Sequence, residues 1–307
     1  MTRRTDSFRK RLVSGLLPAL RVLPPRMALR ALDGLGAMEL RWNLPRRFEL
    51  NTLLSRAMAG LNCDWQVAPT TRMWAGKSLR WHARDYLLEK LSEPELQTMI
   101  QVSGRQHLDR ALEGKRGVVL LFNHFGPFLI HSHWLVRNGY DLRWFTERPR
   151  RISSLVSATF QTDGQLGQKG LFLSRKLAPN QAGGMLRRAL RILDAGMIVQ
   201  VAGDVRWSTG RAVPGRFLGR EFSFTTNWVS LAAHSGAPVV PVFARSNPDG
   251  TYCVDFLEPV LVPETAKQPE TAAAFVQANL DRLEGSIRAN PSDAGDYLYW
   301  LKSRVEG

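Results

Sequence analysis

The sequence predicts an α/β fold, in which a mixed central sheet is flanked by helices and preceded by a basic helical region. Up to about residue 110, apolar positions lie three or four apart with few β-branched runs, a pattern typical of helices. After residue 110, short apolar runs alternate with amphipathic segments, as expected for strands that alternate with helices. The 307 residues, 44% of them hydrophobic, are enough to bury a substantial core.

Three regions are expected along the chain. Residues 1–47 form a basic amphipathic segment, residues 48–110 a helical region packed on the core, and residues 111–307 the α/β core. Within the second region Ser92, which is followed by acidic residues, marks the start of a helix.

The core region contains strand and helix candidates in alternation. The strand candidates are residues 117–125, 141–147, 197–204, 237–245 and 252–262. The helix candidates are residues 127–139, 183–196, 228–236 and 270–289, the first two of them closed by Gly139 and Gly196. In such sheets the reactive site lies beyond the carboxyl ends of the strands. Asn123, His124 and Asp204 occupy such ends, so we expect the site there.

The net charge is +15, from 42 Lys and Arg against 27 Asp and Glu. This balance favours an anionic partner, which is nucleic acid, acidic phospholipid or an acidic carrier protein. The sequence carries no zinc finger, RNA-binding aromatic motif or dense Lys/Arg tail, and its nine tryptophans are dispersed. No nucleic-acid partner is therefore expected.

Basic residues are concentrated near the start of the chain, where residues 1–47 hold eleven of them against three acids. Apolar residues recur there at helical spacing, in one set with Met27, Ala31, Leu35 and Met38 and in another with Leu29, Leu32 and Leu40. A basic amphipathic helix of this kind lies in a membrane interface, with arginines on phosphates and leucines among acyl chains. The alternative is a helix packed on its own domain. We expect peripheral attachment to a membrane surface through this segment.

His124 lies at a strand-to-helix junction, in "VVLLFNHFGPF". A neutral imidazole at such a position can take the proton from an attacking hydroxyl. Gly126 lets the chain turn sharply, and backbone N–H groups near it, in the turn that begins at Asn123, are candidates for stabilising an oxyanion. The alternative is a histidine that only caps a strand or helix. His131 and His133 fit no common zinc spacing, so no metal site is predicted.

Two blocks of the sequence resemble the bacterial lipid A late acyltransferases, the lauroyl and myristoyl transferase family. The first block is "VSGRQHLDRALEGKRGVVLLFNHFGPF", in which glycines and leucines precede an apolar strand and the histidine. The second is "GDVRWSTGRAVPGRFLGREFSFTTNWVSLAAHSGAPVVPVF". The similarity extends more loosely over nearly the whole chain, from about Leu12 to Trp300.

The resemblance implies transfer of an acyl group from a thioester, on acyl carrier protein or coenzyme A, to a hydroxyl or amine of a membrane lipid or glycolipid. His124 would be the general base. The thioester is a co-substrate, and the resemblance implies no metal or redox cofactor. We expect a monomer.

The sequence departs from the family pattern beside the histidine. The family motif is His-x4-Asp/Glu, but Leu129 stands here at the position of the acid, and Asn123 replaces the usual glycine. Three interpretations stay open. Another acid reaches His124; the candidates are Glu147, Asp141 and Asp204. Alternatively, His124 works without an acid, held by a carbonyl or by Asn123. In the third, the protein is a weak or inactive relative that binds lipids or assembles partners.

The second block supplies a candidate binding surface. Its arginines are Arg206, Arg211, Arg216 and Arg220, and they suit the phosphate of an acceptor or carrier. The alternative is an exposed basic loop. Arg206 stands where the family has a second acid after Asp204. Phe128, Leu129 and Ile130 are expected to line an apolar slot for the acyl chain, which would explain a leucine at the position of the acid. Thr225 and Thr226 are expected to cap the helix that follows.

Overall fold

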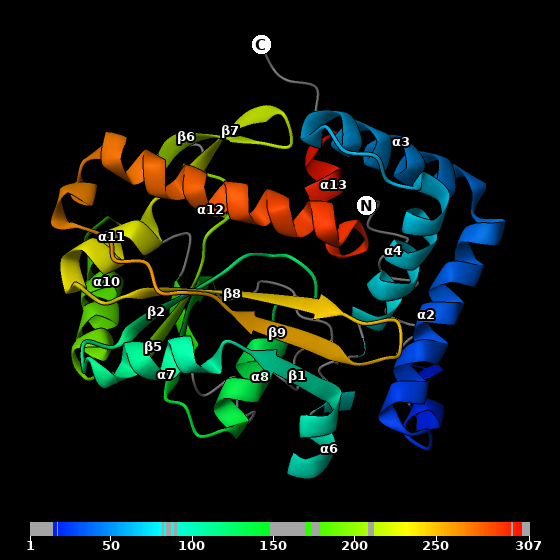
Figure 1. The fold of residues 1–307 in the computed structure, drawn as a ribbon, viewed down its shortest axis with the longest axis horizontal. Coiled ribbons are helices and arrows are strands. Elements are labelled where there is room, and N and C mark those ends of the chain that lie inside the picture. The colour runs from blue at the N-terminus through cyan, green and yellow to red at the C-terminus, as the bar shows by residue number, and fades with distance from the viewer. Residues whose placement is uncertain are drawn as a thin grey trace.

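The structure is a computed structural model (Figure 1). It describes residues 15, 16, 18–81, 83, 87, 88, 91–147, 170–173, 179–207, 212–295 and 297–302.

Among the described residues, seven strands form one mixed sheet in the order β1-β9-β8-β2-β5-β3-β4. The strands are β1 (Ile100–Ser103), β2 (Val118–Phe122), β3 (Leu142–Glu147), β4 (Gly170–Leu173), β5 (Ile198–Ala202), β8 (Val239–Ser246) and β9 (Tyr252–Phe256). The five strands from β8 to β4 in this order are parallel, while β9 pairs antiparallel with β8 and parallel with β1. The predicted mixed sheet with flanking helices is confirmed.

Helices cover both faces of this sheet (Figure 1). One face carries α6 (Glu93–Met99), α7 (Arg105–Glu113) and α8 (Ile130–Arg137), and the other carries α10 (Pro179–Asp194), α11 (Asn227–Ser235) and α12 (Pro269–Ala289). The central strand β2 is buried along its whole length, and its alternate side chains enter two different apolar clusters. A strand buried on both faces reads as a continuous apolar run, which is why "VVLLF" shows no alternation.

Three N-terminal helices lie at one end of the sheet: α2 (Pro25–Trp42), α3 (Leu44–Leu61) and α4 (Val67–Trp81). The face of α2 with Leu29, Leu32 and Leu40 is buried inside the protein. Helices α2 and α4 cross closely, because a Cβ atom built on Gly36 would lie 2.4 Å from the carbonyl oxygen of Ala75. The leucines that we expected among acyl chains therefore pack on the protein's own core, and that expectation is corrected.

Several elements differ from the sequence-based expectation. Ser92 begins α6 as predicted and forms a capping box with Glu95, but the helix ends at Met99 and the chain continues as β1 at the sheet edge. The region 48–110 thus contributes a strand to the core. The expected basic loop of the second block contains a hairpin of β6 (Ala212–Phe217) and β7 (Arg220–Thr225). Thr226 precedes α11 without a capping hydrogen bond from its side chain.

The C-terminal part adds three short helices: η2 (Glu264–Lys267), η3 (Pro291–Asp293) and α13 (Tyr297–Trp300). No helix within the described residues is both long enough and apolar enough to cross a bilayer.

Candidate active site

His124 and Asp204 meet at the carboxyl ends of two neighbouring strands. Strands β2 and β5 are parallel, and their pairing runs from Val118 with Ile198 to Phe122 with Ala202. His124 and Asp204 each lie two residues beyond the end of their strand, so both lie at the same edge of the sheet. The Nδ1 atom of His124 lies 2.8 Å from Oδ1 of Asp204, and the backbone amide of His124 donates to Oδ2 at 2.8 Å. Two bonds from one residue fix both the carboxylate and the ring.

Asp204 is buried, with no exposed side-chain surface, whereas 43% of the His124 side chain is exposed. The hydroxyl of Tyr297 on α13 also donates to Oδ2 of Asp204. Burial alone would raise the pKa of Asp204, but the charge of His124 and the hydrogen bonds from His124 and Tyr297 outweigh burial and lower its pKa. A charged Asp204 accepts a hydrogen bond from Nδ1–H of His124, so Nε2 is the basic nitrogen of the neutral ring.

Of the acids considered for His124 whose side chains the structure describes, Asp204 is in contact with it. Asp141 precedes β3, at the opposite edge of the sheet, where its carbonyl oxygen accepts from the amide of Ile198. The side chain of Glu147 lies outside the described residues. The carboxylate missing at Leu129 is thus supplied from a different strand.

Asn123 does not hold the imidazole. Side chains alternate along an extended chain, so Asn123 points away from His124 and toward α12. There its amide pairs with that of Asn279, whose Nδ2 donates to Oδ1 of Asn123 at 3.0 Å, while the reverse bond is 3.3 Å long. Both residues are buried. Asn123 therefore ties β2 to α12, and the expected roles of its side chain at the ring are corrected.

The Gly126 amide is not available as an oxyanion donor, because it donates to the carbonyl oxygen of Asp293 at 2.8 Å. Gly126 does make the predicted turn, with φ of +55°. A Cβ atom there would lie 2.4 Å from the carbonyl oxygen of Ala244, so the position requires glycine. Our expectation for this amide is corrected.

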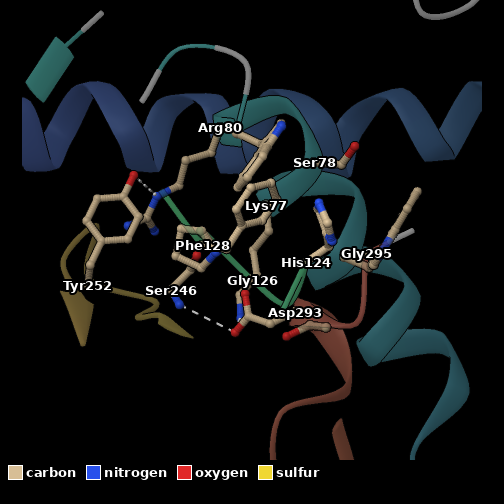
Figure 2. Close-up of a pocket in the computed structure, with 14 residues that line it drawn as sticks. Lys77, Ser78, Arg80, His124, Gly126, Phe128, Ser246, Tyr252, Asp293 and Gly295 are labelled. Carbon is tan, nitrogen blue, oxygen red and sulfur yellow. Dashed lines mark hydrogen bonds and ion pairs between the residues drawn. The ribbon is translucent and has the colours of Figure 1, made fainter. Parts of the chain in front are cut away.

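His124 opens into a pocket of about 100 Å³ between α4, the β2–α8 turn and the C-terminal segment (Figure 2). The lining residues are Trp74, Lys77, Ser78, Arg80, Trp81, His124, Gly126, Pro127, Phe128, Ser246, Tyr252, Ser292, Asp293 and Gly295. Ligand sites commonly measure roughly 300–1,000 Å³, so this pocket admits a reacting group but not a whole lipid.

One wall of the pocket is aromatic. The ring of Phe128 lies 4.9 Å from that of His124, 4.8 Å from Trp81 and 5.6 Å from Phe122, measured between centroids. Leu129 and Ile130 are buried in the apolar core instead. Of the three residues expected to line an acyl slot, only Phe128 faces the pocket, and the other two assignments are corrected.

The opposite wall is polar and was missed by the sequence analysis. Lys77 on α4 binds Asp293 of η3, with 2.7 Å between Nζ and Oδ2. The same oxygen accepts from the amide of Ser246 at the end of β8. No sequence pattern marks Lys77, Asp293 or Tyr297, although "PSDAGDYLYW" stands out as a polar and aromatic stretch after the last long helix.

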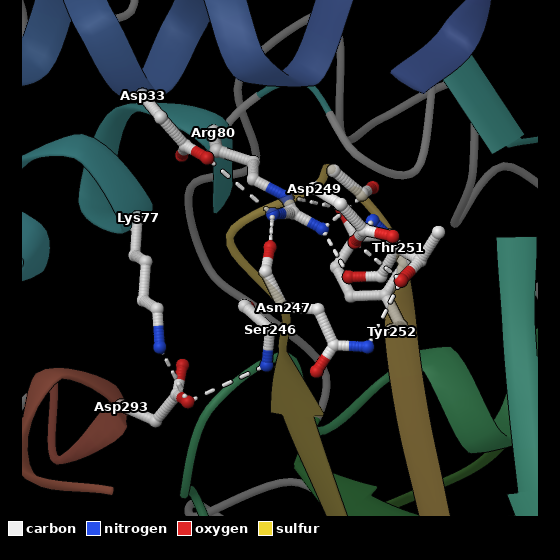
Figure 3. A network of polar contacts seen from close by, with 10 residues as sticks. Asp33, Lys77, Arg80, Ser246, Asn247, Asp249, Thr251, Tyr252 and Asp293 are labelled. Carbon is white, nitrogen blue, oxygen red and sulfur yellow. Dashed lines mark hydrogen bonds and ion pairs between the residues drawn. The ribbon is translucent and has the colours of Figure 1, made fainter.

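Arg80 on α4 holds the turn between β8 and β9 beside this pocket (Figure 3). Its guanidinium donates to the carbonyl oxygens of Asn247, Gly250 and Thr251, at 2.9, 2.8 and 2.7 Å. It also donates to the hydroxyl of Tyr252 at 3.1 Å and binds Asp33 of α2 at 3.4 Å. Burial alone would lower the pKa of Arg80, but the interactions with Tyr252 and Asp33 outweigh burial and raise it.

The arginines of the second block differ in their surroundings where the structure describes them. Arg206 stacks on aromatic rings, with its Cζ atom 4.5 Å from the centroid of Phe222 and 5.0 Å from that of Trp300. Arg216 is exposed on β6, and Arg220 is half-buried at the start of β7. Arg211 lies outside the described residues.

His131 and His133 are buried on α8. Within the described parts of the chain, no group of three His, Cys, Asp or Glu side chains could hold a metal ion.

The comparison with known families gives a match over almost the whole chain. The family described as bacterial lipid A biosynthesis acyltransferase matches residues 2–305. The chain belongs to this family. No curated protein matches the sequence. The family is an acyltransferase family, which suggests transfer of an acyl group to a lipid.

Proposed function

We propose that the protein moves an acyl group from a thioester, on acyl carrier protein or coenzyme A, to a hydroxyl or amine of a membrane lipid or glycolipid, with His124 as the general base. The observation that carries this proposal is the 2.8 Å contact between Nδ1 of His124 and a fully buried carboxylate. A base held by a buried acid, with its ring exposed to a pocket, is the arrangement that acyl transfer requires.

In the proposed reaction, the Nδ1 proton stays on His124 and is hydrogen-bonded to the ionised Asp204, while Nε2 of His124 removes the proton of the acceptor nucleophile. The nucleophile forms a bond to the thioester carbon, and the carbon–sulfur bond then breaks. The imidazolium returns its proton to the leaving thiolate, so the ring is regenerated. Asp204 stabilises the imidazolium between the two proton transfers. The thioester is the co-substrate, and the reaction so written uses no resident cofactor.

The location we propose is the cytoplasmic face of a bacterial inner membrane, with peripheral attachment. The net charge of +15 supports it, because both an acidic carrier and an anionic lipid surface attract a basic protein. The exposed Arg216 and the stacked Arg206 remain candidates for the phosphate of the acceptor or carrier.

The test is thioester turnover by the purified protein, with acyl carrier protein and acyl-coenzyme A donors and a total anionic lipid extract as acceptor. We expect turnover by the wild type and its loss in His124→Ala. The matched control is His234→Ala. This substitution also removes an imidazole, but from an exposed histidine on α11. No turnover with any donor, from protein that still binds anionic liposomes, would favour the non-catalytic lipid-binding protein instead.

A further inference from the structure

Exposed apolar side chains are concentrated on the N-terminal helices. In the described part of the chain ten large apolar side chains are exposed, and eight of them lie on α2 and the turn before it, the first turn of α3, or α4. These eight are Val22, Leu23, Met27, Met38, Trp42, Leu44, Phe48 and Met73. Trp42 and Phe48 are each 76% exposed. Apolar surface gathered in this way marks a site of interaction.

On α2 this surface is the outward stripe of the helix. Met27, Gly34, Met38 and Trp42 are exposed and lie seven, four and four residues apart, which places them along one side. The leucine stripe on the other side of α2 is buried against the core. Helix α2 therefore packs on the core through its leucine stripe, and the stripe with Met27, Met38 and Trp42 faces solvent.

A shallow pocket of about 40 Å³ opens beside this stripe, between α2, α3 and α4. Its lining includes three exposed arginines, Arg41, Arg47 and Arg72, and no acidic residue. Among the described residues these three side chains have no hydrogen bond or ion pair. We call the three arginines, together with Met38, Trp42 and Phe48, the arginine–tryptophan face.

The acids of the same helices are already occupied. The acids of α2 are Asp33, which binds Arg80, and Glu39, which binds Arg46. The acid of α3 is Glu49, which binds Lys302. The residues 67–81 of α4 include no acid. The arginine–tryptophan face thus presents positive charge that no acid of α2, α3 or α4 neutralises.

We propose that the arginine–tryptophan face docks on an anionic phospholipid bilayer, and that Arg41, Arg47 and Arg72 bind a lipid phosphate in the pocket between them. Guanidinium groups suit phosphate oxygens, and tryptophan favours the membrane interface. A protein partner would neutralise the arginines equally well, but the exposed Trp42, Phe48 and Met38 favour acyl chains, into which each can insert separately.

Docking on this face also brings the membrane close to the candidate active site. Thr71 and Arg72 of α4 line the arginine pocket, whereas Lys77, Ser78 and Trp81 of the same helix line the His124 pocket. One helix of 15 residues therefore carries parts of both. This inference adds a membrane contact to the proposed function but does not depend on catalysis.

The experiment is flotation of the full chain with phosphatidylcholine vesicles, with and without phosphatidylglycerol. The variant is Arg41→Gln/Arg47→Gln/Arg72→Gln, and the matched control is Arg110→Gln/Arg191→Gln/Arg282→Gln, which removes the same charge from exposed sites on α7, α10 and α12. We expect binding of the first variant to the anionic vesicles to fall at least about tenfold, because each lost contact weakens attraction to the surface. The control should bind much as the wild type does.

A second variant, Trp42→Ser/Phe48→Ser, tests the apolar part. Ionic attraction is screened by salt but burial of apolar side chains is not, so this variant should lose the binding that survives high salt. Unchanged flotation of both variants would overturn the proposal. So would normal flotation combined with lost binding to acyl carrier protein, which would make this a protein-docking face. His124→Ala should float as the wild type does, so a failure of the proposed catalysis stays distinguishable.

Discussion

At the scale of single residues, Asp204 accepts three hydrogen bonds with two oxygen atoms, from the ring and amide of His124 and from the hydroxyl of Tyr297. A neutral amide in its place would present an NH₂ group to one of these donors. We expect Asp204→Asn to lower kcat roughly 10²- to 10⁴-fold, because the ring loses its orientation and the imidazolium its counter-charge. The measurement is thioester turnover under saturating donor.

Glu147→Gln is the comparison for that variant, since Glu147 is the last residue of β3, the strand that pairs with β5 on the side away from β2. We expect its kcat to stay close to that of the wild type. If Glu147→Gln loses as much activity as Asp204→Asn, or if Asp204→Asn keeps its rate, the assignment of Asp204 as the positioning acid is wrong.

Tyr297 is a positioning residue in the proposed site, because it reaches the reaction only through Asp204. Tyr297→Phe removes the hydroxyl and keeps the ring, which packs edge-on against Phe217 and Trp300. A hydrogen bond to a charged partner contributes roughly 1.5–3 kcal/mol, so the free energy of unfolding should fall by about that amount. We expect a smaller loss of kcat than in Asp204→Asn, since both bonds from His124 remain. Urea denaturation and turnover measure the two effects, and no change in either would contradict this role.

At the scale of elements, Arg80 joins three parts of the fold. It lies on α4, binds Asp33 on α2, and donates to three carbonyl oxygens in the turn between β8 and β9. The side chain is 1% exposed, and its Cζ atom lies 4.1 Å from the centroid of the Tyr252 ring. Arg80 therefore also contributes packing contacts in the interior.

Arg80→Met should therefore be strongly destabilising. The methionine fills much of the volume but leaves Asp33 and the carbonyl oxygen of Gly250 without a donor, and the carbonyl oxygens of Asn247 and Thr251 keep only a backbone N–H. The expected cost is roughly 3–5 kcal/mol. The stability of Arg80→Lys should lie between those of the wild type and Arg80→Met, since one ammonium group cannot reach all the carbonyl oxygens to which the planar guanidinium donates. The check is the midpoint of urea unfolding, with the exposed Arg110→Met expected within about 0.5 kcal/mol of the wild type. Equal stability of Arg80→Met and Arg110→Met would refute the argument.

At the scale of the whole molecule, local pattern predicted five strands of the central sheet, β2, β3, β5, β8 and β9, but neither β1 nor β4. It also did not predict which strands are neighbours. The run before His124 and the run before Asp204 are both recognisable as strands, and their ends are the correct places for a site. Whether β3 or β5 lies beside β2 depends on how the crossover helices pack, which residue spacing does not encode. Glu147 and Asp204 were therefore equal candidates until the strand order was known.

The same limit explains what was misassigned on α2. This helix has two apolar stripes, and a periodic pattern alone does not say which one faces the core. The close crossing at Gly36 decides it by turning Leu29, Leu32 and Leu40 toward α4 and leaving Met38 outside. Tyr297 and Asp293 were missed because short C-terminal helices carry too few residues to show a period.

The stability of the whole molecule should also depend on pH through a buried histidine. His131 is fully buried beside the ring of Phe122, and neither of its ring nitrogens has a hydrogen-bond partner in the described part of the protein. Burial lowers its pKa from 6.5 to about 3. Between these two pH values the unfolded chain binds a proton that the folded chain does not, so stability falls as pH drops from 6.5 toward 3.

The expected slope from this one residue is about 1.4 kcal/mol for each pH unit below 6.5. Carboxylates such as Asp204 add to acid unfolding in both proteins, so the useful quantity is the difference between wild type and His131→Leu. That difference in the free energy of unfolding should grow in favour of the variant from pH 7 to pH 4.5, as measured by urea denaturation. The exposed His234→Leu should show no such growth. If the two variants follow the wild type in parallel at every pH, then His131 is protonated in the folded state and finds a partner when charged.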